Sequence, residues 1–222
     1  MRLNFSFNQL LYAFIAFIML MIAVRFFYFG TYHGVFLAWN IFLAWIPYAV
    51  SRLFQVQRKG WRQRILFGLW LLFWPNALYI VTDLIHINES SKVPAWYDAL
   101  LIFAAAMAGL MMAFVSLFRI EKFITGKLGK TKAFLVMSGV MFIGSFGVYL
   151  GRFYRFNSWD VIHDPVDLAI SLASHFLFPF DHLHTWAVTC ILTIIFSLLY
   201  YSFKILPATI NDIPGKTGKA VA

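Results

Sequence analysis

Residues 65–86 read ILFGLWLLFWPNALYIVTDLIH, and this stretch decides the class of fold. A helix that crosses a bilayer needs about 20 mostly apolar residues, and this segment is apolar over most of its length. Pro75 lies near its middle, where the missing backbone hydrogen bond frees the Leu71 carbonyl and predicts a kink. The stretch therefore predicts a kinked transmembrane helix.

Polar side chains follow the proline at helical spacing. Asn76, Tyr79, Asp83 and His86 are three, four and three residues apart, which places them in one stripe about 80° wide on a helix. A polar stripe within a span faces other helices or a water-filled cavity rather than lipid. The stripe therefore either lines a site or has only a structural role. In the second case Asn76 caps the kink, and Asp83 and His86 end the helix in water.

The rest of the chain also has the composition of a membrane protein. Of its 222 residues, 62% are hydrophobic and 12% are charged, and the mean hydropathy is +0.77. Soluble domains are nearer about half apolar and about a quarter charged, so this chain has too little polar surface for a water-soluble fold. The single cysteine, Cys190, excludes an internal disulfide and a cysteine-cluster metal site.

Six stretches are apolar and long enough to cross a bilayer. They are residues 7–29, 35–54, 65–84, 97–118, 133–151 and 186–206. No small-residue cleavage site follows the first stretch, so we interpret it as an uncleaved span. We expect an all-α bundle of six transmembrane helices that forms a single domain over residues 1–206, followed by a disordered cytoplasmic tail at 207–222.

Charge is segregated between the two sides of this predicted bundle. Fourteen of the 18 lysines and arginines fall on one side, and the other side keeps Arg25, Lys92, Arg152 and Arg155. Cytoplasmic loops are rich in Lys and Arg, so we expect a multi-pass protein of the cell membrane with both termini in the cytoplasm. The net charge of +9 follows from this bias, and no nucleic-acid-binding motif is present, so we expect no nucleic-acid partner.

A short amphipathic segment precedes the last span. Asp164 and Pro165 are typical of a helix N-cap and first helical position, and Pro179 ends the segment. Its polar residues share one face: Asp167, Ser171, Ser174 and His175. The segment is too short to cross a bilayer, so we expect residues 166–178 to form an interfacial helix on the extracytoplasmic side.

A second polar motif, GRFYRFNSWD at residues 151–160, leaves the fifth predicted span. Gly144, Gly147 and Gly151 share the face of that span that we expect to pack closely on another helix. Arg152 and Arg155 lie one turn apart on the side that is poor in positive charge. They either form structural ion pairs or bind an anion such as phosphate, which arginine holds with two parallel hydrogen bonds. Candidate partners are Asp83, Asp98 and Asp160.

The two motifs supply the candidate site. We take Asp83 and His86 as candidate catalytic residues, and we expect one of them to lie near Arg152 or Arg155. The candidate substrate-binding residues come from both motifs and are Asn76, Tyr79, Arg152, Arg155, Asn157 and Asp160.

The histidines near the last span are candidate ligands for zinc. Asp181, His182 and His184, with Asp83 and His86, have side chains that zinc accepts. Such short patterns are common, so we predict no metal site, and the sequence leaves any cofactor undetermined.

Together with the stretch WNIFLAWIP at residues 39–47, these motifs resemble a family of bacterial multi-pass membrane proteins known as domain of unknown function 1361. The family's strings are similar to PNAPYxxTDLxH and GRFxRxNSWD, with Trp and Asp opening the fourth span and a His shortly before Thr-Trp at the last. The matching residues here are Pro75, Asn76, Ala77, Tyr79, Thr82, Asp83 and His86; Gly151, Arg152, Phe153, Arg155, Asn157, Ser158, Trp159 and Asp160; Trp96 and Asp98; and His182, Thr185 and Trp186. Leu78 stands where the family has a second proline, so we expect a milder kink. The resemblance implies a bacterial inner-membrane location and carries no known activity.

Three functions stay open. The first is an enzyme with an extracytoplasmic site that acts on an anionic or lipid-linked substrate, such as a phosphate-bearing lipid, and contacts membrane lipid. The second is a non-catalytic membrane scaffold or subunit, and the third is a small transporter. An enclosed pocket lined by Asp83, His86 and Arg152 would favour the enzyme. A cluster in which every charge is paired and closed to solvent would favour the scaffold. A water path through the bundle would favour the transporter. The sequence does not identify protein partners.

Overall fold

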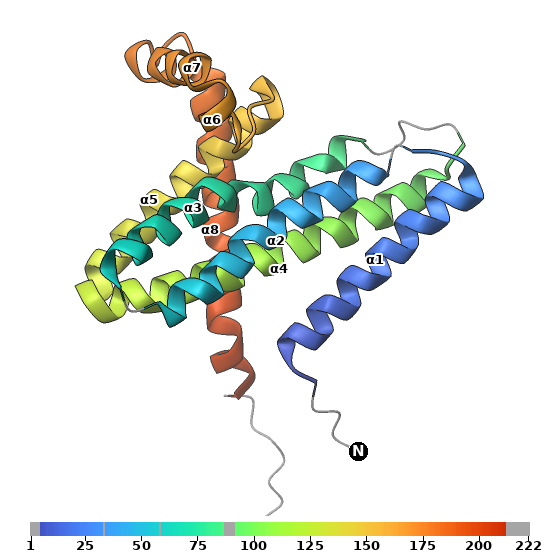
Figure 1. Cartoon of the computed structure of the whole chain (residues 1–222), viewed down its shortest axis with the longest axis horizontal. Helices are drawn as coiled ribbons and strands as arrows, with labels where there is room; N and C mark the ends of the chain where they lie inside the picture. The colour runs from blue at the N-terminus through green and yellow to red at the C-terminus, as the bar shows by residue number, and fades with distance from the viewer. Residues whose placement is uncertain (1–4, 33, 58, 87–91, 212–222) are drawn as a thin grey trace, which may run out of the picture.

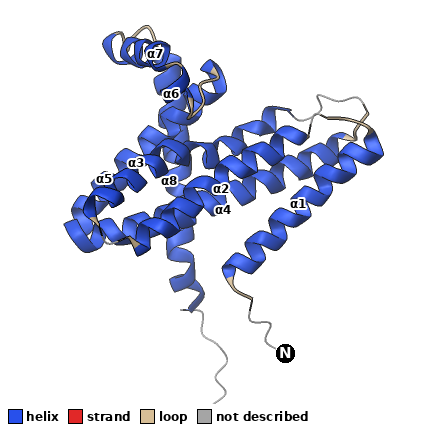
Figure 2. Ribbon diagram, in the orientation of Figure 1, coloured by secondary structure: helices blue, strands red, loops and turns tan. Residues whose placement is uncertain are grey.

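A computed structural model of the chain describes residues 5–32, 34–57, 59–86 and 92–211. All regular structure in these residues is helical (Figure 2). Six helices are apolar and long enough to cross a membrane, which confirms the predicted all-α membrane bundle. They are α1 (Phe7–Phe29), α2 (Val35–Val56), α3 (Gly60–Tyr79), α4 (Ala95–Leu128), α5 (Lys130–Tyr149) and α8 (Leu183–Asn211).

The spans pack as a bundle in which α2, α3 and α4 form the centre. Helices α1, α2 and α4 lie side by side, α5 lies beside α3, and α8 crosses the bundle against α5 (Figure 1). The two ends of the bundle are called here the Asp83 end and the Arg64 end, after residues near the two ends of the third span. At the Arg64 end the Tyr48 hydroxyl donates to Asn8, and Arg119 donates to the Tyr48 carbonyl at 3.2 Å.

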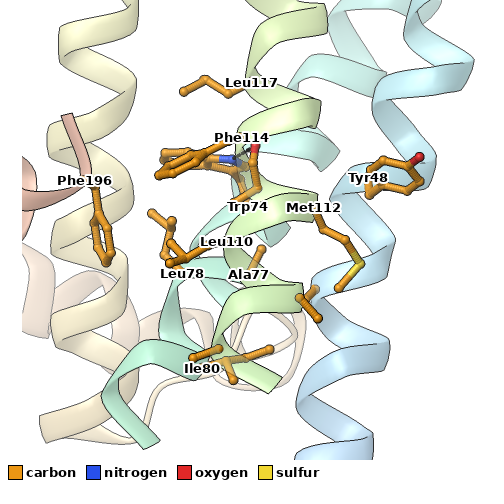
Figure 3. Packing of buried hydrophobic residues seen from close by; sticks show 14 of the residues in the cluster. Tyr48, Trp74, Ala77, Leu78, Ile80, Leu110, Met112, Phe114, Leu117 and Phe196 are labelled. Atoms are coloured by element: carbon orange, nitrogen blue, oxygen red, sulfur yellow. Dashed lines mark hydrogen bonds between the residues drawn. The ribbon is translucent and has the colours of Figure 1, made fainter. Parts of the chain in front are cut away.

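The core is built on two buried tryptophans of α3. Trp70 and Trp74 have no exposed surface, and each indole N–H finds a partner on α4: Ser116 Oγ at 3.1 Å and the Ala113 carbonyl at 3.1 Å, respectively. Trp74 lies beside Phe114 in the same layer (Figure 3). A buried indole N–H without an acceptor would destabilise the fold by its desolvation free energy. These two hydrogen bonds therefore fix the register between α3 and α4.

The glycine face of α5 packs against α3. A Cβ atom at Gly144 would lie 2.3 Å from Cζ3 of Trp74, and one at Gly147 would lie 2.8 Å from Cγ of Pro75. At Gly151 the distance to the ring of Tyr79 would be 3.3 Å. The predicted tight packing of this face is confirmed, and its partner is the third span. The contacts also show that α3 and α5 run parallel, with Gly151 at the level of Tyr79.

Helix α3 continues through Pro75 to Tyr79 and then tightens into the 3-10 helix η1 (Ile80–His86). The α-helical part thus ends within the predicted span of 65–84. Helix α5 changes in a similar place, where the π-helix η2 (Leu150–Tyr154) carries Arg152. Irregular helical turns are frequent at functional sites, and here two of them occur at the Asp83 end of the bundle.

Helices α4 and α8 continue well past the predicted ends of their spans. Helix α4 runs on to Leu128, so Arg119, Lys122 and Lys127 lie on a helix rather than in a loop. Helix α8 continues through Pro207 to Asn211, so the chain is still helical where the tail was predicted to begin, and residues 212–222 lie outside the described residues. An ion pair joins the extension of α4 to α8, because Lys204 donates to the nearly buried carboxylate of Glu121 at 2.6 Å.

The predicted amphipathic segment is the short helix α7 (Pro165–Leu177), which follows the single turn α6 (Asp160–His163). Pro165 occupies the first turn as predicted, whereas the side chain of Asp164 makes no capping hydrogen bond. His175 is fully buried against the bundle, while Ile170 and Leu177 are exposed. The helix therefore presents a wide apolar surface away from the bundle, as a helix in a membrane interface would.

Candidate functional site

The two sequence motifs meet at an ion pair. Arg152 of η2 donates through Nη2 to Oδ1 of Asp83 on η1, and through Nε to Oγ1 of Thr82 at 2.9 Å. The second carboxylate oxygen of Asp83 accepts from Nδ2 of Asn40 on α2 at 2.7 Å. Asp83 is only 1% exposed. The predicted contact between Asp83 and Arg152 is confirmed, and it ties three separate spans together.

The ring of Tyr79 also contacts Arg152. The guanidinium carbon lies 4.4 Å from the centroid of the Tyr79 ring, a distance at which the ring's negative face attracts the cation. The absence of a side chain at Gly151 allows this ring to lie close to η2, since a Cβ there would be 3.3 Å from the ring. Arg152 is therefore held between a carboxylate and an aromatic face.

The chain after η2 turns back along α3. Arg155 adopts a left-handed conformation with φ of 60°, which reverses the direction of the chain. The turn is braced by Asp160, whose Oδ2 accepts from the backbone N–H of Asn157 at 2.6 Å. Ser158 then reaches α3, where its hydroxyl accepts from Asn76 Nδ2 at 2.8 Å and donates to the Leu72 carbonyl at 2.9 Å.

This returning loop meets α3 beside the proline. Pro75 has no N–H, so it cannot bond the carbonyl four residues earlier, and the helix surface around it has spare acceptors. Ser158 uses the neighbouring carbonyl of Leu72, and Asn76 also donates to the Phe73 carbonyl at 3.1 Å. Trp159 packs edge-on against Trp39 of α2, with ring centroids 6.1 Å apart. The loop is thus fixed to both α2 and α3.

A cavity of about 620 Å³ lies inside this frame, and it is called here the Asn76 cavity. It is bounded by α2, α3, α5, the returning loop and one face of α7. Its polar lining residues are Asn40, Asn76, Tyr79, Asp83, Asn157 and Ser158. Its apolar lining includes Leu43, Gly68, Leu71, Leu72, Ile143 and Phe146, and Leu168 and Leu172 of α7 close one side. A cavity of this size suits a small organic ligand or a lipid chain.

The other predicted site residues fall in different places. Arg152 lies outside the cavity lining and holds Asp83. Arg155 is exposed beside the cavity residue Asn157, and within the described part of the chain its guanidinium pairs with no carboxylate. Asp160 accepts a hydrogen bond within the returning loop and does not line the cavity. The side chain of His86 lies outside the described residues, so its predicted role stays a prediction.

A second buried ion pair lies outside the cavity. Arg25 of α1 donates to both oxygens of Asp98 on α4, at 2.7 and 3.1 Å, and to the hydroxyl of Thr31 at 2.7 Å. Both charged side chains are 4% exposed. Asp98 is therefore the partner of Arg25, and of the three carboxylates considered for Arg152, Asp83 is the one in contact.

Neither Asn40 nor Ser158 is among the predicted site residues, and the apolar wall of the cavity was not predicted. The signal for Ser158 was its place in the motif at residues 151–160, but nothing local predicts that the chain turns back. The leucines of α7 look like the lipid-facing side of an interfacial helix. Their contact with the cavity depends on where α7 docks.

The histidines near the last span form an aromatic cluster. The rings of His175 and His182 stack with centroids 4.0 Å apart, and Nδ1 of His175 lies 2.6 Å from the Ser171 carbonyl oxygen. Nδ1 of His184 lies 3.2 Å from the Tyr149 hydroxyl. Within residues 5–32, 34–57, 59–86 and 92–211, no group of three or more His, Cys, Asp or Glu side chains is arranged to hold a metal ion.

Comparison with known families matches residues 39–199 to the family described as "Protein of unknown function (DUF1361)". The match covers most of the chain from the second to the last span, including both motifs and every residue that lines the Asn76 cavity except Phe36. No curated protein and no solved structure matches the chain.

Proposed function

The chain belongs to the DUF1361 family, whose description names no activity, and we propose its function from the Asn76 cavity. We propose that it is an enzyme that binds an amphiphilic, anionic substrate, such as a lipid-linked phosphate, in this cavity. The substrate's polar group would lie at the Asp83 end, and its apolar chain would extend toward Gly68. The observation that carries the proposal is a membrane-embedded cavity with polar groups at one end and an apolar wall at the other.

The length of the cavity supports a ligand with an extended chain. Gly68 and Asp83 both line it and are 15 positions apart, which corresponds to about 22 Å along a helix. This is more than half of the roughly 30 Å hydrocarbon core of a bilayer. Apolar side chains dominate the part near Gly68, where a hydrocarbon chain gains from contact and a hydrated group does not.

The charges near the cavity support an anionic head. Asp83 balances Arg152, so this pair adds little net charge to the site. Arg155 then remains as an exposed guanidinium next to Asn157, which lines the cavity. A phosphate held by Arg155 would lie near the side-chain amide of Asn157, a group that donates hydrogen bonds to oxygen anions.

The same groups suggest how a reaction would be assisted. Amide and hydroxyl donors in a water-poor site stabilise negative charge that develops during a reaction. Asn40 and Tyr79 supply such groups at the polar end of the cavity. Asp83 accepts hydrogen bonds on both oxygens, so we assign it the role of a positioning residue that orients Asn40 and Arg152. His86 remains our candidate base.

The scaffold alternative has an observation of its own. In both buried arginine–aspartate pairs the two charged groups contact each other, and each pair joins two spans, as structural ion pairs do. In that case the cavity would hold a structural lipid without chemistry. The lining around Gly68 is apolar, which lends no support to a hydrated transport path.

The proposed orientation follows from the charge bias. With the Arg64 end in the cytoplasm, the Asn76 cavity would open at the extracytoplasmic side of the cell membrane. A bacterial inner membrane is the location that we propose.

Substitution of Gly68 tests the proposal. A Cβ atom at Gly68 would meet nothing within 4 Å, and Gly68 lines the cavity, so we expect the side chain of Gly68→Leu to take up part of its volume. Gly139→Leu is the matched control, because that glycine also has open space and does not line the cavity. Native mass spectrometry of the purified proteins would identify retained amphiphiles, and incubation in lipid nanodiscs with the identified amphiphile would show turnover.

We expect wild type and Gly139→Leu to retain and convert the amphiphile and Gly68→Leu to lose both properties. Retention by wild type without conversion would support the scaffold alternative. Equal behaviour of the two glycine variants, with no amphiphile bound, would overturn the proposal.

A further inference from the structure

A second cavity lies at the opposite end of the bundle. It has a volume of about 680 Å³, and it is lined by residues of α2, α3, α4 and α5 near the Arg64 end. We call it the Lys127 cavity. It takes no part in the site described above, although both cavities include Gly68 in their lining.

The polar part of the Lys127 cavity is cationic. Arg64 of α3 and Lys127 of α4 both line it and both are exposed. Nζ of Lys127 lies 3.5 Å from Oε1 of Gln63, a long contact with a neutral group, and 4.4 Å from the centroid of the Phe123 ring. No carboxylate lines the cavity in the described part of the chain. Glu121 lies two residues before Phe123 on α4, and its carboxylate accepts hydrogen bonds from Tyr200 and Lys204.

The rest of the Lys127 cavity is apolar. Phe54, Phe67, Ile124 and Val136, from four different helices, form its wall. Among the described residues no acidic side chain pairs with these two cations, and an apolar wall lies next to them. This combination matches a ligand with an anionic head and a hydrocarbon chain. A soluble anion would leave the apolar wall exposed, and an uncharged lipid would leave the cations unpaired.

The arrangement of the two cavities points the same way. They lie along α3 and both reach Gly68, while their polar groups are at opposite ends of that helix. This is the arrangement of lipids in the two leaflets of a bilayer, whose heads point outward and whose chains meet at the midplane.

We propose that the Lys127 cavity binds an anionic phospholipid from the leaflet at the Arg64 end of the bundle. Its phosphate contacts Arg64 and Lys127, and one acyl chain lies against Phe67 and Val136. The proposal is independent of the chemistry at the Asn76 cavity.

The test compares two double variants that lose the same charge. Arg64→Gln with Lys127→Gln removes both cations of the cavity, and Lys122→Gln with Lys132→Gln removes two exposed cations of the same end that do not line it. Purified proteins are exchanged into detergent with defined amounts of phosphatidylglycerol or phosphatidylcholine. Native mass spectrometry then measures the bound lipid, and inorganic phosphate is titrated as a competitor.

We expect wild type and the control variant to retain phosphatidylglycerol in preference to phosphatidylcholine. The cavity variant should bind phosphatidylglycerol about thirtyfold more weakly, because each cation near a phosphate contributes about 1 kcal/mol. A third variant, Val136→Trp, should lower phosphatidylglycerol binding while both cations remain. This variant still tests the proposal if the double variant of the cavity does not fold.

Equal loss in the two double variants would show a diffuse charge effect and overturn the proposal. Displacement of the lipid by inorganic phosphate at equal concentration would also overturn it, because the acyl chain would then contribute nothing.

Discussion

Arg152 lies over the ring of Tyr79, with its guanidinium carbon 4.4 Å from the ring centroid, while its Nη2 atom donates to Asp83 one turn further along the same span. The arginine is thus held from two sides by the third span. A cation that is fixed and neutralised in this way is a structural element of the site. We therefore propose that Arg155, the exposed arginine of the same motif, binds the anionic ligand.

Asp83→Asn should destabilise the protein. The change leaves the cation of Arg152 without its carboxylate, and Asp83 and Arg152 have side chains that are 1% and 11% exposed. Breaking a buried pair from one side costs about 3–5 kcal/mol of unfolding free energy. Reversible unfolding in mixed micelles would measure the loss. Asp83→Asn with Arg152→Gln should recover part of it, and Asp167→Asn, at an exposed position, should have little effect. A loss no larger than that of Asp167→Asn would contradict the structural role of the pair.

Asp98→Asn should loosen the first helix. Arg25 is the buried cation of α1, and its bidentate contact with Asp98 joins α1 to α4. We expect faster hydrogen exchange in α1 and a lower unfolding temperature, with α2 to α5 changed less. Hydrogen-exchange mass spectrometry would measure this by segment. Uniform protection across the bundle in the variant would argue against a specific anchor for α1.

Gly144→Ala and Gly139→Ala should have opposite effects. A Cβ at Gly144 would lie 2.3 Å from Cζ3 of Trp74, so the helices must separate, and overpacking of this kind costs about 1–3 kcal/mol. Gly139 is on the same helix with open space, and alanine there should stabilise α5 by up to about 1 kcal/mol. The two unfolding free energies should therefore move in opposite directions. A stabilising effect at both positions would mean that α5 does not contact Trp74.

Arg155→Gln should weaken the binding of an anionic amphiphile with little change in stability, because this side chain is exposed and pairs with no carboxylate among the described residues. Lys92→Gln is the matched control, since it removes an exposed cation that does not adjoin the cavity. Titration with the lipid found by mass spectrometry should give a Kd about tenfold or more higher for Arg155→Gln, the loss of a charged hydrogen bond. An equal Kd in the two variants would remove Arg155 from the site.

Thiol labelling tests the orientation. The background would be Cys190→Ser, because the native cysteine is exposed on α8. In whole cells an impermeant reagent should label Lys92→Cys at the Asp83 end and leave Lys130→Cys at the Arg64 end unlabelled, because basic connections stay in the cytoplasm. Both residues are exposed. The reverse labelling pattern would place the Asn76 cavity toward the cytoplasm.

The sequence alone was sufficient for the membrane class and the number of candidate spans. Both depend on the length of apolar runs, which is a local property of the chain. The stripe of Asn76, Tyr79 and Asp83 was also found locally, because helical periodicity places these residues on one face, and all three line the cavity. The ends of two spans were predicted too early, because α4 and α8 continue as helices past their apolar runs.

The pairing of charges was decided by tertiary structure. Three carboxylates were candidates for Arg152, and nothing in the sequence distinguished them. The choice follows from the register of α5 on α3, which the contacts of Gly144 and Gly147 with Trp74 and Pro75 set. That register brings Arg152 to Asp83, just as the packing of α1 on α4 brings Arg25 to Asp98.

The Asn76 cavity likewise exists only in the folded bundle. Periodicity shows which face of one helix is polar, but it does not show that the chain reverses at Arg155 and returns to Asn76 through Ser158. Nor does it show that Leu168 and Leu172 of α7 close the side of the cavity. Local sequence determines which residues prefer a membrane and a helix. The space between helices depends on contacts between segments far apart in the chain, and so only the tertiary structure determines it.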